Sequence, residues 1–131
     1  MRRWILVWVV AVVSGGCVNV QVNEVSAFTP EVTHIVVCWL KNPANAADRA
    51  QLINESRNLG HIPGVVSVSA GTVLPSDRAA VDSSFDVAIV MKFKDEAALV
   101  SYSKNPMHLA AVERTLKPLV AKYVVYDFRE E

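Results

Sequence analysis

Tyr102 and His108 stand six residues apart in the stretch SYSKNPMHLA. A histidine with a pKa near neutrality can take a proton from a carbon next to a carbonyl group. A tyrosine hydroxyl can donate a hydrogen bond to the oxygen on which negative charge then develops. The two residues therefore fit proton abstraction next to a carbonyl, with His108 as the base and Tyr102 as the donor.

The same stretch also fits an ordinary helix start. Pro106 suits the first position of a helix, and Asn105 before it is a good N-cap residue. His108 would then lie in the first turn and bond locally, while Tyr102 would pack its ring in the core. Three interpretations therefore stay open for Tyr102 and His108: a structural role, the lining of a binding pocket, or catalysis.

The sequence has two further histidines, His34 and His61. His34 shares one face of a predicted strand with Val36 and Cys38, so helices on that face would place His34 and His108 in one apolar pocket. His61 lies in the turn HIPG and is predicted to be exposed. No two histidines have the i, i+4 spacing of a local ligand pair, so no metal site is predicted. There is no glycine-rich phosphate loop either, and no cofactor is predicted.

The segments that must position these side chains show strand patterns and helix patterns in turn along the chain. The clearest strand is FDVAIVMKF, in which large apolar residues occupy every second position. Asn45 is predicted to cap the first helix, and Gly60 to end it. The predicted strands are Val32–Lys41, Val65–Leu74, Phe85–Phe93 and Ala121–Phe128, and the predicted helices are Ala46–Leu59, Asp95–Ser103 and Met107–Leu116. This β-α-β-β-α-β order, with two short helices in the second helical segment, predicts a ferredoxin-like α+β fold.

The first and third predicted strands carry apolar residues on both faces. Helices that cover one face of a sheet leave the other face open, and an open face is normally polar. In a chain of 131 residues, only a second copy offers enough surface to cover it. We therefore expect a homodimer through the sheet face, which forms a dimeric α/β barrel. The alternative is a monomer with a partly apolar open sheet.

The N-terminus is typical of a secretory leader. Two arginines precede the apolar run Trp4–Val13, and small residues follow it up to Cys17. The run is shorter than the roughly 20 residues of a membrane-spanning helix. The stretch VVSGGC resembles a bacterial lipobox, which implies a signal peptide over residues 1–16 and a lipid on Cys17 that anchors the chain to a membrane. In Gram-negative lipoproteins, an Asp after the lipid-modified Cys tends to retain the protein in the inner membrane. Here Val18 follows Cys17, so the resemblance implies the outer membrane, facing the periplasm, if the source is Gram-negative. An ordinary secreted protein and an uncleaved anchor are the alternatives.

Residues 17–30 are predicted to be a polar tether, and residues 31–131 to be one domain. Removal of the leader takes two of the 13 basic residues, which leaves 11 against 13 acidic residues, a net charge of −2. No cluster of basic residues appears, so nucleic acid is not a predicted partner.

A lipid on Cys17 would leave Cys38 without a disulfide partner, and Cys38 is predicted to be a buried thiol.

Taken in order, the segments HIVVCWLK, HIPGVVSVSAG, FDVAIVMKFKDEAALVSYSKNPMH and VVYDF resemble the stress-responsive A/B barrel (Dabb) domain family. The resemblance implies a dimeric α+β barrel of ferredoxin-like subunits, in a family whose members mostly have no known activity. A polyketide cyclase of the family uses a tyrosine and a histidine in the equivalent of YSKNPMH, and a second histidine in its first strand. By position these correspond to Tyr102, His108 and His34, while Asn105 stands where the cyclase has another histidine.

These observations predict a membrane-tethered, dimeric module that is stress-related or binds a small apolar or aromatic acid. The alternative is a lyase or cyclase-type enzyme that acts on a polyketide-like or aromatic acid. In that alternative, His108 is the base, Tyr102 is the hydrogen-bond donor, and His34 lies in the same pocket.

Overall fold

A computed structural model of the chain describes residues 31–131. The predicted signal peptide (1–16), Cys17 and the predicted tether (17–30) lie outside the described residues. In the described part of the chain, no helix combines the length and the apolar character that crossing a membrane requires.

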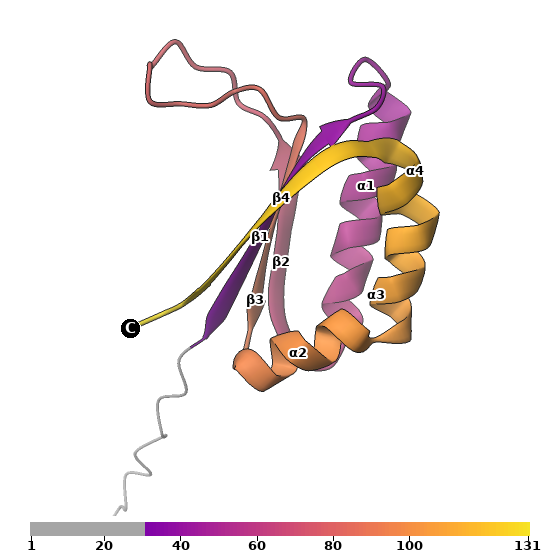
Figure 1. The fold of residues 1–131 in the computed structure, drawn as a ribbon, viewed down its shortest axis with the longest axis vertical. Helices are drawn as coiled ribbons and strands as arrows, with labels where there is room; N and C mark the ends of the chain where they lie inside the picture. Colours follow the sequence, from indigo (N-terminus) through magenta and orange to yellow (C-terminus); the bar gives the residue numbers. More distant parts are fainter. Residues whose placement is uncertain (1–30) are drawn as a thin grey trace, which may run out of the picture.

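Four strands form one antiparallel sheet in the order β2-β3-β1-β4, with the helices on one side (Figure 1). The element order confirms the predicted ferredoxin-like α+β fold. The strands are β1 (Val32–Leu40), β2 (Val65–Thr72), β3 (Val87–Phe93) and β4 (Val120–Arg129). The helices are α1 (Ala46–Asn58), α2 (Glu96–Lys104), α3 (Pro106–Ala111) and α4 (Lys117–Leu119), with a 3-10 turn η1 (Leu59–His61) and a π-helical turn η2 (Val112–Leu116).

Side chains cap the helices where short polar residues precede them. The Asn45 side chain accepts a hydrogen bond from the Ala47 N–H at 2.9 Å, which confirms the predicted cap of α1. The Asn105 side chain accepts from the Met107 N–H at 2.8 Å, and Pro106 fills the first position of α3. These bonds satisfy N–H groups that have no partner within the helix. The start of α3, and with it the position of His108, is therefore set locally.

Strands β2 and β3 are shorter at their connection than predicted. Strand β2 ends at Thr72 rather than Leu74, and β3 begins at Val87 rather than Phe85. Just before β3, the Asp86 carboxylate accepts a hydrogen bond from the Leu40 N–H at 2.7 Å, and the Asp86 N–H donates to the Cys38 carbonyl oxygen at 2.9 Å. Beyond the last paired residues of β1 and β3, Cys38 and Val87, Asp86 therefore still bonds to β1 through its backbone and its side chain.

The predicted helix Met107–Leu116 is regular only in its first half. It begins at Pro106 and is α-helical to Ala111, after which the turn η2 has the wider π-helical hydrogen-bond pattern. Residue propensities do not distinguish a π turn from an α turn, so the sequence could not indicate this change. π turns inside helices are frequent at functional sites.

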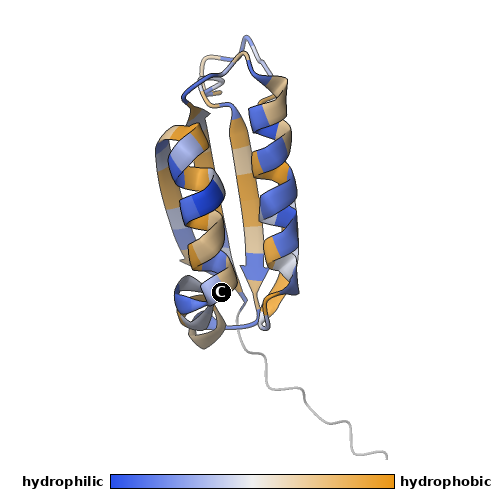
Figure 2. Cartoon of the chain, turned by 90° about the vertical axis from the view of Figure 1, so that its right-hand side faces the viewer, coloured by the Kyte–Doolittle hydropathy of each residue, from blue (hydrophilic) through white to orange (hydrophobic). Residues whose placement is uncertain are grey.

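The strand register assigns the side chains to two faces. His34 pairs with Met91 and Val36 pairs with Ile89, and these four side chains face the helices. Ile35 and its neighbours lie on the opposite face, which no helix covers (Figure 1); the apolar side chains there are Ile35, Val37, Ala88, Val90, Val124, Tyr126 and Phe128. Figure 2 shows α1 lying side by side with the α3–η2 segment in front of the sheet. The alternation in β1 and β3 therefore separates a face that meets the helices, which carries His34, from a face that none of them covers.

Cys38 lies in the core between sheet and helices. It has no exposed surface, as its predicted role as a buried thiol requires. Burial raises the pKa of the Cys38 thiol to about 11. The thiol therefore stays protonated at neutral pH and acts as a small apolar side chain.

The turn before β2 holds α2 close to the sheet. Gly64 has a φ of +92°, and a Cβ atom at this position would lie 2.7 Å from the Ala98 Cβ of α2. A side chain here would force α2 away, since real Cβ atoms do not approach so closely. Gly64 therefore helps to place α2, the helix that carries Tyr102.

Candidate functional site

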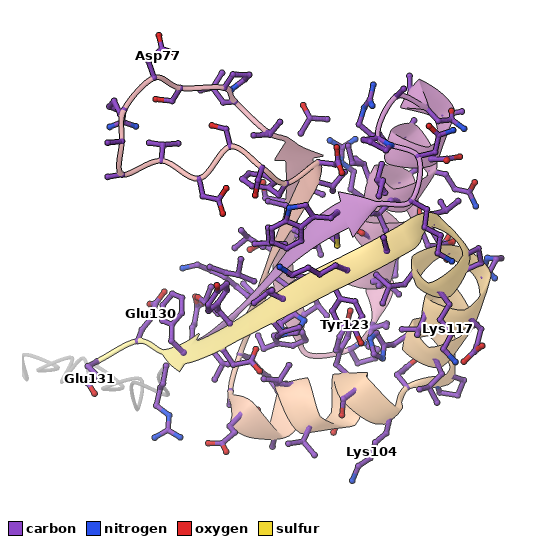
Figure 3. All side chains as sticks on the ribbon, turned by 45° about the horizontal axis from the view of Figure 1, so that its top comes forward. Asp77, Lys104, Lys117, Tyr123, Glu130 and Glu131 are labelled. Atoms are coloured by element: carbon purple, nitrogen blue, oxygen red, sulfur yellow. The ribbon has the colours of Figure 1, made fainter. Side chains whose placement is uncertain are left out.

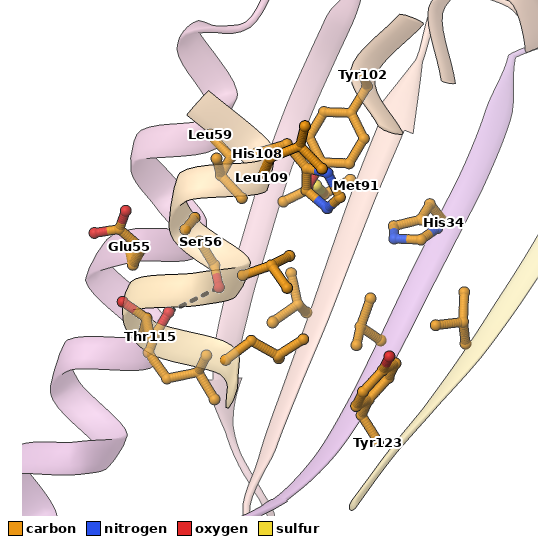
Figure 4. A pocket seen from close by; sticks show the side chains of 17 residues that line it. His34, Glu55, Ser56, Leu59, Met91, Tyr102, His108, Leu109, Thr115 and Tyr123 are labelled. Atoms are coloured by element: carbon orange, nitrogen blue, oxygen red, sulfur yellow. Dashed lines mark hydrogen bonds between the residues drawn. The ribbon is translucent and has the colours of Figure 1, made fainter. Parts of the chain in front are cut away.

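A cavity of about 360 Å³ lies between the helices and the β1–β4 side of the sheet (Figure 4). It exists because α1 and α2 pack mainly against β2 and β3, so the helix layer covers β1 and β4 less closely. Its wall is mostly apolar, with a small number of polar side chains, which is usual for small-molecule sites. The polar or titratable residues that line it are His34, Glu55, Ser56, Tyr102, His108, Thr115 and Tyr123.

Strand β4 forms the open side of this cavity. Tyr123 and Val125 lie on the face of β4 that is turned toward the helices, yet they are 54% and 40% exposed. Figure 3 shows Tyr123 beside β4, between the strand and the helices. A ligand can therefore enter along this edge of the sheet.

Tyr102 and His108 are in direct contact inside the cavity. Their ring centroids are 4.4 Å apart, with the ring planes tilted by 40°. Tyr102 is only 3% exposed, and its ring packs edge-on against Phe93 at a centroid distance of 4.9 Å. Burial raises the pKa of the Tyr102 hydroxyl well above its usual range. The hydroxyl therefore stays protonated and available as a hydrogen-bond donor.

His108 has a neutral ring with a defined tautomer. Its Nδ1 lies 3.3 Å from the Ser103 carbonyl oxygen. Since a carbonyl only accepts, the proton is assigned to Nδ1, and Nε2 carries the lone pair. Partial burial lowers the pKa of His108, and the nearby His34 lowers it further, while the Ser103 hydrogen bond acts in the opposite direction. His108 is therefore a neutral base at pH 7.

His34 is held by a carboxylate that the sequence analysis did not single out. Its Nδ1 lies 2.6 Å from Oδ1 of Asp127, and the two residues are directly paired across β1 and β4. The carboxylate accepts a hydrogen bond from the Nδ1 N–H, which orients the ring. One signal could have indicated Asp127: it follows Tyr123 and Val125 at alternate positions of the last strand.

The three predicted site residues converge. His34, Tyr102 and His108 all line the cavity, and the ring centroids of His34 and Tyr102 are 6.2 Å apart. His61 lies elsewhere, is exposed, and has its Nδ1 2.9 Å from the Asn58 carbonyl oxygen. Within residues 31–131, no group of three or more His, Cys, Asp or Glu side chains has a spacing that could hold a metal ion. The roles of the three converging residues stay predictions.

The helical wall of the cavity carries polar groups that sequence analysis missed. The Ser56 hydroxyl of α1 donates to the Leu52 carbonyl at 2.7 Å, and Glu55 forms an ion pair with Arg114. Thr115 of η2 is buried, and its hydroxyl has no hydrogen-bond partner. Their positions depend on how α1 packs against the α3–η2 segment, which a single sequence does not specify.

The lowered pKa of His108 predicts how stability varies with pH. The unfolded chain binds a proton at the ordinary value of 6.5, whereas folded His108 does so only at lower pH. His108 should therefore lower the free energy of unfolding as pH falls from 6.5 through its folded-state pKa, with no such loss above 6.5. NMR titration of ¹⁵N-labelled histidine measures the midpoint, and His108→Gln identifies the signal and should reduce the acid sensitivity. A folded-state midpoint at or above 6.5 would contradict this assignment.

Comparisons with known proteins support the fold and identify the family. A crystal structure of a Dabb family protein from Mesorhizobium loti, also with a ferredoxin-like fold, is 24% identical, covers 79% of this chain and 99% of that chain, and has a TM-score of 0.64. A dimeric ferredoxin-like protein of unknown function from Thermobifida fusca is 21% identical over 78% of this chain and 92% of that chain, with a TM-score of 0.63. The hydroxynitrile lyase from Passiflora edulis is 26% identical over 77% of this chain and 94% of that chain, with a TM-score of 0.65.

None of the curated proteins compared with the chain matches it in sequence. The model of the Stress Responsive A/B Barrel Domain family, in contrast, matches residues 32–130, which include every described strand and helix. The match agrees with the resemblance seen in the four ordered segments of the sequence. The chain therefore belongs to the stress-responsive A/B barrel domain (Dabb) family.

Proposed function

We propose that the chain is a dimeric, membrane-tethered module that binds a small, largely apolar carbonyl compound in the cavity between sheet and helices. One observation carries this proposal: Tyr102, His108 and His34 converge in a mostly apolar cavity of about 360 Å³. A volume of this size suits a small organic ligand. The family name suggests a stress-related setting, which the cavity itself does not specify.

The polar groups in the cavity suit a carbonyl oxygen. The Tyr102 hydroxyl stays protonated because burial raises its pKa, so it donates a hydrogen bond to that oxygen. The apolar side chains around it lower the local dielectric, which strengthens the bond. A flat aromatic ketone or acid combines the oxygen with the apolar surface that such a wall accepts.

The second candidate is an enzyme of the lyase or cyclase type. It is favoured by the free Nε2 of neutral His108 beside Tyr102, and by the His34–Asp127 pair in the same cavity. The likeness at 26% identity to a hydroxynitrile lyase is consistent with lyase chemistry. In the proposed step, Nε2 of His108 takes a proton from the carbon next to the carbonyl. The C–H electron pair forms a carbon–carbon double bond, and the carbonyl electrons move to the oxygen that Tyr102 holds.

Acetophenone tests both candidates, since it has one carbonyl and a methyl group with protons next to it. The full chain, purified in mild detergent, should bind acetophenone in calorimetric titrations corrected for micelles. Tyr102→Phe should weaken binding about fivefold to tenfold through the loss of one hydrogen bond. In D₂O, NMR should show exchange of the methyl protons only if His108 acts as a base.

His61→Gln is the matched control for His108→Gln, because His61 lies outside the cavity. Binding without exchange would support the binding module. Exchange that His108→Gln abolishes and His61→Gln retains would favour the enzyme. If acetophenone does not bind, or binds equally well to Tyr102→Phe, the proposed site is wrong.

We further propose that two copies pack through the uncovered sheet face. Ile35, Val37 and Val90 at its centre are only half-buried by their own subunit, and Tyr126 and Phe128 at its edge are 58% and 51% exposed. Contiguous apolar surface of this kind usually marks a protein interface. The similar protein from Thermobifida fusca is a dimeric ferredoxin-like protein, which supports the same arrangement here.

We also propose that the chain is exported and carries a lipid on Cys17. Support comes from the sequence alone: the charged start, the apolar run Trp4–Val13 and the stretch VVSGGC. Residues 17–30 would then tether the domain to the membrane surface. With Val18 after Cys17, the lipobox resemblance favours the outer membrane, facing the periplasm, if the source is Gram-negative.

Native mass spectrometry of the full chain, extracted from membranes in mild detergent, tests the dimer and the lipid together. We expect two subunits, each beginning at a lipid-modified Cys17. Val90→Asp should give monomers, because it places a charge in the centre of the apolar face. Val100→Asp, at a 47% exposed position on α2, should leave the dimer intact. A monomeric native chain would contradict the interface, and subunits that retain residues 1–16 would contradict the processing.

A further inference from the structure

We propose that the Thr115 hydroxyl binds a second oxygen-bearing group of the ligand. The cavity would then select a carbonyl compound that carries a hydroxyl at its far end. This inference rests on the proposed binding function and narrows its ligand class. It is carried by two features of Thr115: an unpaired buried hydroxyl and a position in the wall of the cavity, within a π-helical turn.

The first feature is the missing hydrogen-bond partner. Thr115 is only 1% exposed, lines the cavity, and its Oγ1 contacts no donor or acceptor within hydrogen-bond distance. Most buried polar side chains have a partner, because an unpaired one lowers stability. Thr33 and Ser83 also have buried hydroxyls without a partner, but of these three residues only Thr115 lines the cavity, where a ligand group can supply the missing partner.

The second feature is the helical turn that holds this residue. In an α-helix, a serine or threonine hydroxyl can donate to the carbonyl four residues before it. Ser56 of α1 does so, with its hydroxyl 2.7 Å from the Leu52 oxygen. Thr115 lies in the π-helical turn η2, where the backbone spacing differs and no such bond forms. The Thr115 hydroxyl is therefore not used by its own helix, unlike that of Ser56.

The position of Thr115 determines where the second group must lie. His108 and Thr115 are seven residues apart along one helical segment, so roughly 10 Å of helix separates them. The wall between them is apolar, with Ala111 and Val112 facing the cavity. Figure 4 shows Thr115 beside Ser56 and Glu55, away from Tyr102 and His108. A ligand that reaches both ends is therefore elongated, as an aromatic ring with oxygens at opposite positions is.

Threonine can meet such a group with little rearrangement. Its oxygen both donates and accepts, so it can pair with a phenol or an alcohol. In the ligand-free protein the hydroxyl is enclosed, so it meets a ligand group by turning about the Cα–Cβ bond. Threonine in helices occupies two rotamers about this bond, so the turn is accessible.

The test compares 4-hydroxyacetophenone with acetophenone, two ketones that differ only in the hydroxyl opposite the carbonyl. Calorimetric titrations use the full chain in mild detergent as the native protein, Thr115→Val and Ser56→Ala. We expect the native protein to prefer 4-hydroxyacetophenone by roughly tenfold. Thr115→Val should reduce this preference to about one while keeping its affinity for acetophenone. Ser56→Ala, which removes the paired hydroxyl, should retain the preference.

Thermal unfolding without ligand gives a second readout. Thr115→Val should keep or raise the melting temperature, since it removes an unpaired buried hydroxyl, whereas Ser56→Ala should lower it. A Thr115→Val variant that still prefers 4-hydroxyacetophenone, or loses stability as Ser56→Ala does, would overturn the role of Thr115 and leave the binding function standing. If acetophenone binds to none of the proteins, the binding function fails, and this inference fails with it.

Discussion

The helices cover only one face of the four-stranded sheet, and they pack mainly over β2 and β3. Two surfaces follow from this arrangement. On the helix side, β1 and β4 are left incompletely covered, and the space above them is the cavity. On the other side, a row of apolar side chains has no cover within the subunit. The proposed ligand site and the proposed dimer interface are therefore two consequences of one packing geometry.

Burial gives Tyr102 and His108 protonation states that complement each other. The same apolar surroundings raise the pKa of Tyr102, which stays protonated, and lower the pKa of His108, which stays neutral. A hydrogen-bond donor and a base thus lie in contact at neutral pH. This is the pairing that a carbonyl ligand can use, whether or not a proton is transferred.

The elements could be predicted from the sequence, and the convergence of His34 with Tyr102 and His108 could be expected on the condition that the His34 face of its strand meets the helices. These features depend on local patterns: alternation along strands, capping residues before helices, and the order of the elements. Asp127 could not be assigned a role, because its partner His34 is 93 residues away and the pairing depends on the β1–β4 register. The unpaired hydroxyl of Thr115 could not be predicted from the sequence either, since it depends on how the π turn and the neighbouring helix are packed.

The central claim, that a carbonyl compound binds between the sheet and the helices, can be tested with the three histidines of the chain. His34 and His108 line the cavity, and His61 lies outside it. In ¹⁵N-histidine-labelled full chain, acetophenone should shift the signals of His34 and His108 and leave that of His61 in place. If no signal shifts, or if His61 shifts alone or as much as the other two, the cavity is not the binding site.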